Sequence, residues 1–284
     1  MNAPLPPESL PASKQRLSDA LRSMDKVAVA VSGGVDSLTL ATFAHRLLGT
    51  SVTMYHAVSP AVPPAATQRT RAIAQQEGWH LEVMDAGEFA SEDYLRNPSN
   101  RCYFCKTNLY ASVTRHTQGQ VVSGTNMDDL GDYRPGLSAA KEHAVRHPFV
   151  EAGMSKQAVR ALARELGMPD IADLPSSPCL SSRVETGIAI DPAILRAIDS
   201  VEEYLRSTLP SMGLPSKNVR CRYRLRGVVV ELDEAVLAQL GESQRANLSA
   251  PVTEAFSACS PGATVLFEPY RLGSAFLHPV KLVR

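Results

Sequence analysis

The residue pattern with the clearest chemical meaning is a short loop of glycine and serine near the start of the chain. Residues 32–37 read Ser-Gly-Gly-Val-Asp-Ser, directly after an apolar run and before a stretch with helical spacing. Paired glycines let the main chain turn tightly and bring its N–H groups against a phosphate. The following helix adds unpaired N–H donors and the positive end of its dipole. The pattern predicts a phosphate-binding loop that uses Ser32, Gly33, Gly34, Asp36 and Ser37.

This loop lacks the lysine of the Walker A motif. A Walker A loop ends in Gly-Lys-Ser/Thr, and its lysine binds the β- and γ-phosphates of the nucleotide. Residues 32–37 contain no lysine. A loop of this kind is better suited to holding pyrophosphate as a leaving group than to transferring a γ-phosphate. We therefore expect ATP to be split into AMP and pyrophosphate. A glycine turn that only joins a strand to a helix is the alternative interpretation.

Three cysteines stand in contexts that allow chemistry. Cys102 and Cys105 form a Cys-x-x-Cys pair ahead of a helical stretch, and Cys179 lies in a long polar loop. Such a pair is compatible with a redox site, half of a zinc site or two buried thiols. Zinc would need a second pair, and Cys221 and Cys259 stand alone. With Cys179 the pair supplies three thiolates, the usual protein share of a cluster with one open iron. A [4Fe-4S] cluster and plain thiols are both open interpretations.

Charged residues at the expected strand and helix ends are further candidates. Asp128 and Asp129 follow the strand expected at 120–123, at the carboxyl edge of the sheet, where α/β proteins bind ligands. One of the two is expected to bind Mg²⁺ or a ribose, with capping of a helix start as the alternative. Lys156 opens the next helix and is expected to neutralise phosphate charge, the alternative being an exposed surface lysine.

Arginines are candidates for substrate binding and for thiol activation. Arg220 and Arg222 are two residues apart in an expected strand, which places both on one of its faces. Two arginines on one face fit a substrate phosphate, and a solvated strand face is the alternative. Arg183 follows Cys179 by four residues and is expected to favour the ionised form of that thiol.

Apolar runs that alternate with helical spacings indicate a parallel sheet with helices on both faces. Strands are expected at 26–31, 51–57, 81–84 and 120–123, and helices at 37–48, 65–77 and 155–166. The composition changes after a polar loop at 170–187. A helix from Asp191 then precedes further elements, namely strands at 218–223, 227–232 and 263–267 and a helix at 233–240. We expect an α/β nucleotide domain at 1–187 and a small α+β domain at 188–284, for substrate binding or oligomerisation.

Composition and charge narrow the class of protein. Lys+Arg and Asp+Glu both total 29, so the chain has no net charge, and a strongly basic nucleic-acid binder is not indicated. No apolar run approaches the roughly 20 residues that cross a bilayer. Residues 1–13 are rich in proline and lack the basic start and apolar stretch of a signal peptide, so a loose arm is expected there. Five cysteines in 284 residues suit a reducing compartment, and we expect the cytoplasm.

The phosphate loop resembles the Ser-Gly-Gly-x-Asp-Ser signature of the PP-loop ATP pyrophosphatases. Four further segments, in this order and spacing, resemble the LarE family of ATP-dependent sulfur transferases of nickel-pincer nucleotide biosynthesis; they are residues 97–106, 124–136, 148–160 and 175–183. The resemblance implies a PP-loop fold for the first domain, with ATP and Mg²⁺ bound there. It also implies that Gly124 belongs to the nucleotide site and that Glu231 accompanies Arg220 and Arg222.

The resemblance further implies a reaction. In the family, ATP adenylates a carboxylate of a pyridinium dicarboxylate mononucleotide, and a cysteine in a Pro-Cys-Leu segment then forms a thioester. Cleavage of the C–S bond of that cysteine leaves a thiocarboxylate on the product. Cys179 is the matching position. Some relatives carry a [4Fe-4S] cluster that delivers sulfide, and Cys102, Cys105 and Cys179 would hold such a cluster here.

The C-terminal part of the chain departs from the family pattern. Residues 271–274 match it, but Arg224 stands where the family has a histidine, Val229 where it has an arginine and Leu266 where it has an aspartate. Because these positions bind the substrate in the family, the reaction type is expected to carry over better than the substrate. We expect a homo-oligomer that acts on a small carboxylated nucleotide and has neither a membrane nor a nucleic acid as partner.

Three alternatives compete with this interpretation. They are a PP-loop tRNA thiolase, another PP-loop amidotransferase or synthetase, and a nucleotide-binding module without turnover. A thiolase should contain a basic RNA-binding domain, against which the neutral charge balance speaks. A module without turnover should have lost Asp36 or Cys179, and both are present.

Overall fold

The computed structural model describes residues 9–131, 134–176 and 178–271. The chain divides into two compact units. The N-terminal unit is formed by Met1–Ala90 with Cys102–Ser177, and the C-terminal unit by Ser91–Arg101 with Pro178–Arg284. The sequence predicts a single boundary after residue 187. The structure instead groups residues 178–187, and a segment from the middle of the first predicted domain, with the C-terminal unit.

The N-terminal unit is built on a four-stranded parallel sheet with the strand order β3-β2-β1-β4. Its strands are β1 (Val27–Ala30), β2 (Val52–Ala57), β3 (His80–Met84) and β4 (Gln120–Ser123). All four confirm the strands predicted from the apolar runs. The central strand β1 is buried along its whole length, as a strand covered on both faces must be.

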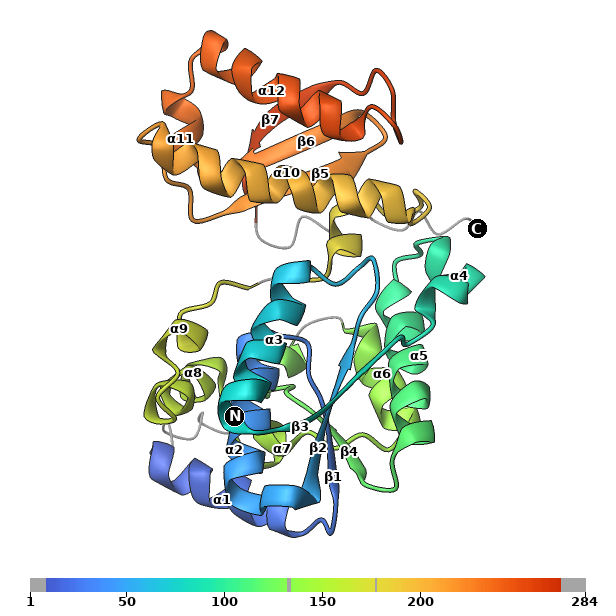
Figure 1. Ribbon diagram of the computed structural model, residues 1–284, viewed down its shortest axis with the longest axis vertical. Helices are drawn as coiled ribbons and strands as arrows, with labels where there is room; N and C mark the ends of the chain where they lie inside the picture. The colour runs from blue at the N-terminus through green and yellow to red at the C-terminus, as the bar shows by residue number, and fades with distance from the viewer. Residues whose placement is uncertain (1–8, 132–133, 177, 272–284) are drawn as a thin grey trace, which may run out of the picture. The chain divides into compact units, whose positions relative to one another are not determined.

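Helices cover both faces of this sheet (Figure 1). On one face Val27 and Val29 pack among residues of α1 (Leu10–Arg22), α2 (Val35–Leu48), α3 (Pro64–Glu77) and α8 (Lys156–Glu165). On the other face Ala28 and Ala30 pack against α5 (Arg101–His116) and α6 (Pro135–Glu142). This division follows from the alternation of side chains along β1.

Two predictions for irregular segments were wrong in part. The expected loose arm at 1–13 contains the start of α1 at Leu10, while residues 1–8 lie outside the described part of the chain. The polar loop expected at 170–187 contains α9 (Pro169–Ala172) and the 3-10 turn η4 (Leu180–Arg183). Each spans four residues, about one turn, and so leaves no periodicity in the sequence.

The C-terminal unit combines a long helix with a small mixed sheet. Asp191 caps α10 (Pro192–Ser211), which packs against β5 (Val219–Arg224) and α12 (Glu242–Phe256). β5 pairs antiparallel with β6 (Gly227–Leu232), which pairs parallel with β7 (Val265–Pro269). The other α-helices of the described residues are the short α4 (Glu92–Leu95), α7 (Pro148–Glu151) and α11 (Glu234–Gln239), of which α7 belongs to the N-terminal unit.

The segment 91–101 joins the C-terminal unit through buried polar contacts. Asn97 is fully buried, and its amide donates to the carbonyls of Glu185 and Ile188 at 2.8 Å each. The Tyr94 hydroxyl lies 2.6 Å from that of Ser181. These contacts tie the segment to the residues that follow Cys179. Among the residues that the structure describes, no helix is long and apolar enough to cross a membrane.

Candidate functional site

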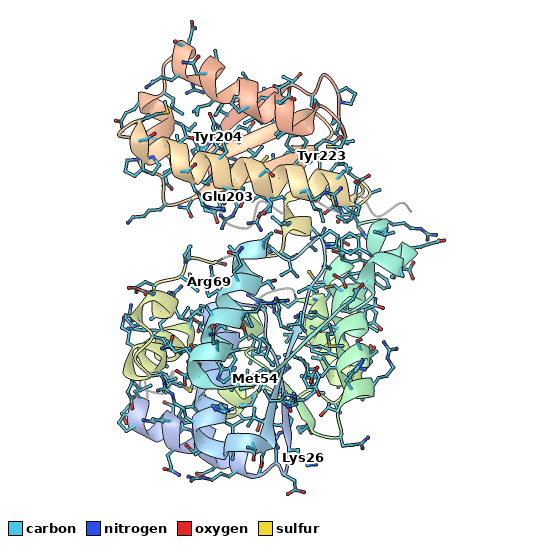
Figure 2. The ribbon with its side chains drawn as sticks, in the orientation of Figure 1. Lys26, Met54, Arg69, Glu203, Tyr204 and Tyr223 are labelled. Carbon is cyan, nitrogen blue, oxygen red and sulfur yellow. The ribbon has the colours of Figure 1, made fainter. Side chains whose placement is uncertain are left out.

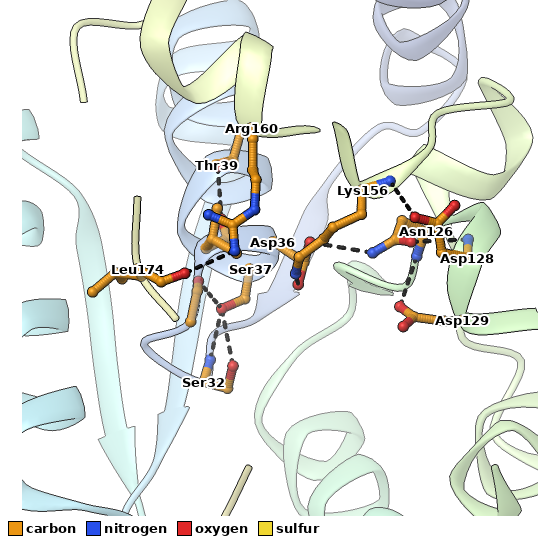
Figure 3. A network of polar contacts seen from close by, with 12 residues as sticks. Ser32, Asp36, Ser37, Thr39, Asn126, Asp128, Asp129, Lys156, Arg160 and Leu174 are labelled. Atoms are coloured by element: carbon orange, nitrogen blue, oxygen red, sulfur yellow. Dashed lines mark hydrogen bonds and ion pairs between the residues drawn. The ribbon is translucent and has the colours of Figure 1, made fainter. Parts of the chain in front are cut away.

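The predicted phosphate loop lies between β1 and α2 and is held by its own side chains. The Ser37 hydroxyl accepts a hydrogen bond from the main-chain N–H of Ser32 at 3.0 Å and donates to the Gly34 carbonyl at 3.2 Å (Figure 3). The hydroxyl groups of Ser32 and Ser37 lie 3.1 Å apart. Both serines therefore shape the loop through these hydrogen bonds.

The three glycines of the site differ in whether the surrounding atoms leave space for a side chain. Gly33 has a φ of +78°, and a Cβ there would lie 2.6 Å from the Ala66 carbonyl oxygen. A Cβ on Gly124 would lie 2.8 Å from main-chain atoms of Asp36 and Ser37. At Gly34 a Cβ would meet only the Ser32 hydroxyl, at 3.6 Å. Packing thus requires glycine at Gly33 and Gly124, whereas Gly34 leaves open space beside the loop.

Asp36 is the centre of a polar network in the first turn of α2. Its carboxylate accepts from Lys156 Nζ at 2.5 Å and from the Asn126 amide at 3.2 Å (Figure 3). Lys156 was predicted to neutralise phosphate charge, and in this structure it neutralises Asp36. Since Asp36 belongs to the loop segment 32–37, this ion pair lies beside the predicted phosphate position.

Asp128 and Asp129 act as caps here. Asp128 accepts from the main-chain N–H of Lys156 at 3.1 Å, at the start of α8. Asp129 accepts from the N–H of Asn126 at 3.1 Å and forms an ion pair with Arg134 at 2.8 Å. These contacts are those of the capping alternative, and the Mg²⁺ or ribose role stays a prediction. No group of three or more His, Cys, Asp or Glu side chains suited to a metal ion occurs within the described ranges.

Cys102 and Cys105 do not precede their helix, as the sequence suggested, but lie within its first turns. Both are half-buried residues of α5, which begins at Arg101. Residues three apart in a helix share a face, so two thiols are presented together there. Cys179 belongs to the C-terminal unit, and the three-cysteine cluster stays a prediction.

The segment that carries Cys179 is fixed through its main chain. The Cys179 carbonyl accepts from the Ser182 N–H at 3.0 Å, the Ser182 hydroxyl at 2.7 Å and Arg183 Nη1 at 3.0 Å. Arg183 Nη1 also donates to the Pro178 carbonyl. The Cys179 side chain is half-buried. The observed contacts of Arg183 are those of a positioning residue, and its predicted effect on the thiolate remains untested.

Arg183 is paired with a buried acid that the sequence analysis missed. Its guanidinium donates to Glu202 of α10 through Nε at 3.0 Å and Nη2 at 3.3 Å, and the two side chains are 1% and 2% exposed. Glu202 also accepts from Arg206 at 2.5 Å and from the N–H of Cys221 at 3.2 Å. Burial opposes ionisation, but Arg183 and the other arginines outweigh it and lower the pKa of Glu202.

Arg220 and Arg222 are buried, each with 7% exposure, so the alternative of a solvated strand face is wrong. Arg222 forms an ion pair with Glu231 at 2.7 Å and donates to the Ser182 carbonyl at 3.1 Å. Arg220 donates to the Val219 carbonyl and lies 5.7 Å from the centre of the Tyr270 ring. Burial lowers the pKa of Arg220, which nevertheless remains charged at neutral pH.

Cys221 and Cys259 are the two remaining cysteines. Cys221 is completely buried between Arg220 and Arg222, and burial raises the pKa of its thiol well above the ordinary value. Burial also raises the pKa of Cys259. Both therefore stay neutral thiols at neutral pH, and only thiolates are good nucleophiles.

The predicted site residues thus fall into two groups. The N-terminal unit brings together the phosphate loop with Gly124, Asp128, Asp129 and Lys156, and it also contains Cys102 and Cys105. The C-terminal unit brings together the Cys179 segment with Arg183, Arg220, Arg222 and Glu231. Of the residues in the 271–274 match, Leu272, Gly273 and Ser274 lie outside the described residues.

Sequence reasoning missed Arg69, Asn126 and Glu202. Glu202 lies on the buried face of α10 beside Ile198 and Leu205. A carboxylate at a helix position that otherwise faces the core indicates a buried, positively charged partner, so the sequence could have predicted this pair. Arg69 reaches the loop only because α3 packs beside it, and no local pattern indicates that contact.

No model of a known protein family matches the chain. It is 38% identical to an uncharacterized protein of Synechocystis, over 69% of this chain and 75% of that protein. It is 26% identical to an uncharacterized protein of Methanocaldococcus jannaschii, over 77% and 82% of the two chains. It is 30% identical to the pyridinium-3,5-bisthiocarboxylic acid mononucleotide synthase of Lactiplantibacillus plantarum, over 80% of this chain and 82% of the synthase. This extent of similarity shows that the chain belongs to the LarE family.

Proposed function

We propose that this protein is an ATP-dependent sulfur transferase that adenylates a carboxylate of a small nucleotide and delivers sulfur through Cys179. The observation that carries the proposal is the lysine-free phosphate loop, whose Gly34 is open to a ligand in the N-terminal unit. The relative named as a mononucleotide synthase supports a pyridinium carboxylate as the acceptor. A reducing compartment such as the cytoplasm would keep the thiols reduced.

The first half-reaction would take place at the loop. Main-chain N–H groups beside Gly34 and at the start of α2 would bind the β- and γ-phosphates. The substrate carboxylate would attack the α-phosphorus of ATP, forming an acyl-adenylate as pyrophosphate leaves. Mg²⁺ bound with the nucleotide would neutralise phosphate charge, and Asp128 or Asp129 would hold it, since Asp36 is paired with Lys156.

The second half-reaction would use the Cys179 thiolate. It would attack the acyl carbon and release AMP, leaving a thioester. Removal of the Cα proton of Cys179 by a base would then break the Cβ–Sγ bond, with the electron pair leaving on sulfur. The products are a thiocarboxylate and a dehydroalanine in the chain. Cys102, Cys105 and Cys179 would hold the cluster in the other route, in which sulfide from the cluster replaces the cysteine sulfur.

The products of ATP cleavage test this proposal. With MgATP and the pyridinium dicarboxylate mononucleotide, we expect AMP and pyrophosphate, which chromatography of the nucleotides and a pyrophosphatase-coupled assay would measure. Gly34→Val should abolish nucleotide binding because the side chain fills the open approach to the loop. The φ of −93° at Gly34 suits any residue, so the unfolding temperature should change little. ADP and orthophosphate as products would contradict the proposal, and sulfur found in tRNA instead would indicate the thiolase.

Arg220 is the better of the two arginines for testing acceptor binding. Replacing Arg222 would leave the buried Glu231 with the ion pair to Arg224 alone. A loss of protein stability could then not be separated from a loss of acceptor binding. We expect Arg220→Met to weaken acceptor binding by about 1.5–3 kcal/mol, the cost of losing a charge-assisted hydrogen bond, with ATP affinity unchanged. Titration calorimetry would measure both. Arg226→Met removes the same charge from an exposed position and serves as the control. Unchanged acceptor affinity in a folded Arg220→Met protein would contradict the assignment.

A further inference from the structure

Helix α3 is built against the phosphate loop and brings an arginine to it. Its first turn is so close to Gly33 that a Cβ on that glycine would lie 2.6 Å from the Ala66 carbonyl oxygen. One turn further along, Arg69 Nη1 donates to the Gly33 carbonyl at 2.7 Å. Figure 2 shows Arg69 on this helix. The arginine is thus in direct contact with the main chain that would wrap a phosphate.

The charge of Arg69 has no acidic partner in the described part of the chain. Arg183 and Arg222 pair with Glu202 and Glu231, whereas no ion pair between described residues involves Arg69. Its side chain is half-buried, and burial lowers the pKa of the guanidinium with no acidic neighbour to raise it. An arginine remains charged under these conditions. The N-terminal unit therefore holds a partly desolvated cation against a loop suited to an anion.

Other polar contacts of the loop leave this charge uncompensated. The carbonyl of Gly33 uses one of the five N–H donors of the guanidinium. Asp36, the acidic residue of the loop segment, is neutralised by Lys156 instead. A guanidinium is a planar fork that can bind two phosphate oxygens at once.

We propose that Arg69 binds the phosphate groups of the nucleotide and retains pyrophosphate after adenylation. This inference rests on the proposed function and deepens it. Arg69 supplies from α3 the positive charge that a Walker lysine supplies from its own loop. Its contact with Gly33 then orients the guanidinium as well as the loop.

The test compares pyrophosphate with AMP as probes in titration calorimetry. Arg69→Gln removes the charge but keeps an amide that can donate to the Gly33 carbonyl. We expect it to weaken pyrophosphate and ATP binding about 10- to 100-fold, as for other hydrogen bonds to charged groups. AMP binding should change by less than about threefold, since this probe lacks the β- and γ-phosphates. Arg69→Lys keeps the charge and should retain most of the affinity.

Arg71→Gln is the matched control, since it removes an equal charge from an exposed position of the same helix and should leave binding unchanged. Pyrophosphate affinity that is unchanged in Arg69→Gln but lost in Arg69→Met would show that the arginine only braces the loop, and would overturn the inference. A wild-type protein that binds ATP but not pyrophosphate would overturn it as well. A wild-type protein that binds neither would overturn the proposed function with it.

A second measurement avoids any loss of folding in the variants. Phenylglyoxal modifies accessible arginines, and peptide mapping of the wild-type protein would report the extent of modification at Arg69. We expect pyrophosphate to protect Arg69 and to leave Arg71 reactive. Modification of Arg69 that proceeds equally with and without saturating pyrophosphate would overturn the inference.

Discussion

Replacing Cys179 with alanine is expected to abolish sulfur transfer completely while ATP binding persists. In the cysteine route the variant lacks the nucleophile and the sulfur, and in the cluster route it lacks a ligand. The phosphate loop belongs to the other unit and should be unaffected. Mass spectrometry of the pyridinium product would measure the transfer. Sulfur transfer that survives in Cys179→Ala would contradict both routes and remove this chain from the sulfur-transfer class.

Cys102→Ser separates the two routes. If Cys179 donates its own sulfur, the variant should complete one turnover, and the spent chain should lose about 34 Da, the mass of H₂S, because dehydroalanine remains. If a cluster supplies sulfide, the anaerobically purified wild-type protein should contain iron and be brown. Cys102→Ser should then be colourless and inactive, and turnover should leave the chain mass unchanged. Cys259→Ser is the control for loss of a half-buried thiol and should be fully active in either case.

The sheet of the N-terminal unit could be predicted because its strands are continuous apolar runs. β4 was predicted at its observed bounds, and β1 and β2 within one residue at each end. The position of the glycine loop between β1 and α2 also followed from the sequence, while its binding of phosphate stays a prediction. The residues that close packing requires could not be predicted in this way. Packing requires glycine at Gly33 and Gly124 but not at Gly34, and this difference depends on neighbours from α3 and α2 that no local pattern names.

The unit boundary could not be predicted because it depends on contacts between distant segments. Asn97 reaches Glu185 and Ile188, which are about ninety residues further along the chain. The Cys179 segment likewise follows the N-terminal unit in sequence but is bound by Arg183 to α10. Arg220 and Arg222 were correctly placed on a strand, but the alternation pattern does not tell a solvated face from a buried one. Arg222 is buried beside Ser182 and Glu231, which come from other segments of the chain that no local pattern names.

Breaking the Arg183–Glu202 pair should have the largest effect on stability. Glu202→Gln keeps the shape of the side chain but leaves Arg183, which is 1% exposed, without its counter-charge. An uncompensated buried charge costs about 3–5 kcal/mol of unfolding free energy. Urea unfolding of the intact chain, followed by fluorescence, would measure this loss. Glu203→Gln removes the same charge from the exposed neighbour on α10, labelled in Figure 2, and should change stability by less than about 0.5 kcal/mol.

A double variant separates the stability of this pair from its positioning of Cys179. In Arg183→Met with Glu202→Gln neither member of the pair is left as an uncompensated buried charge, and the amide oxygen can still accept from the Cys221 N–H. Most of the lost unfolding free energy should therefore return. Sulfur transfer should not return, because the Cys179 carbonyl has lost the Arg183 donor that fixes its segment. Adenylation, measured as pyrophosphate release, should proceed in the wild-type protein, in Glu202→Gln and in the double variant. A double variant with wild-type transfer would show that Arg183 and Glu202 serve the fold alone.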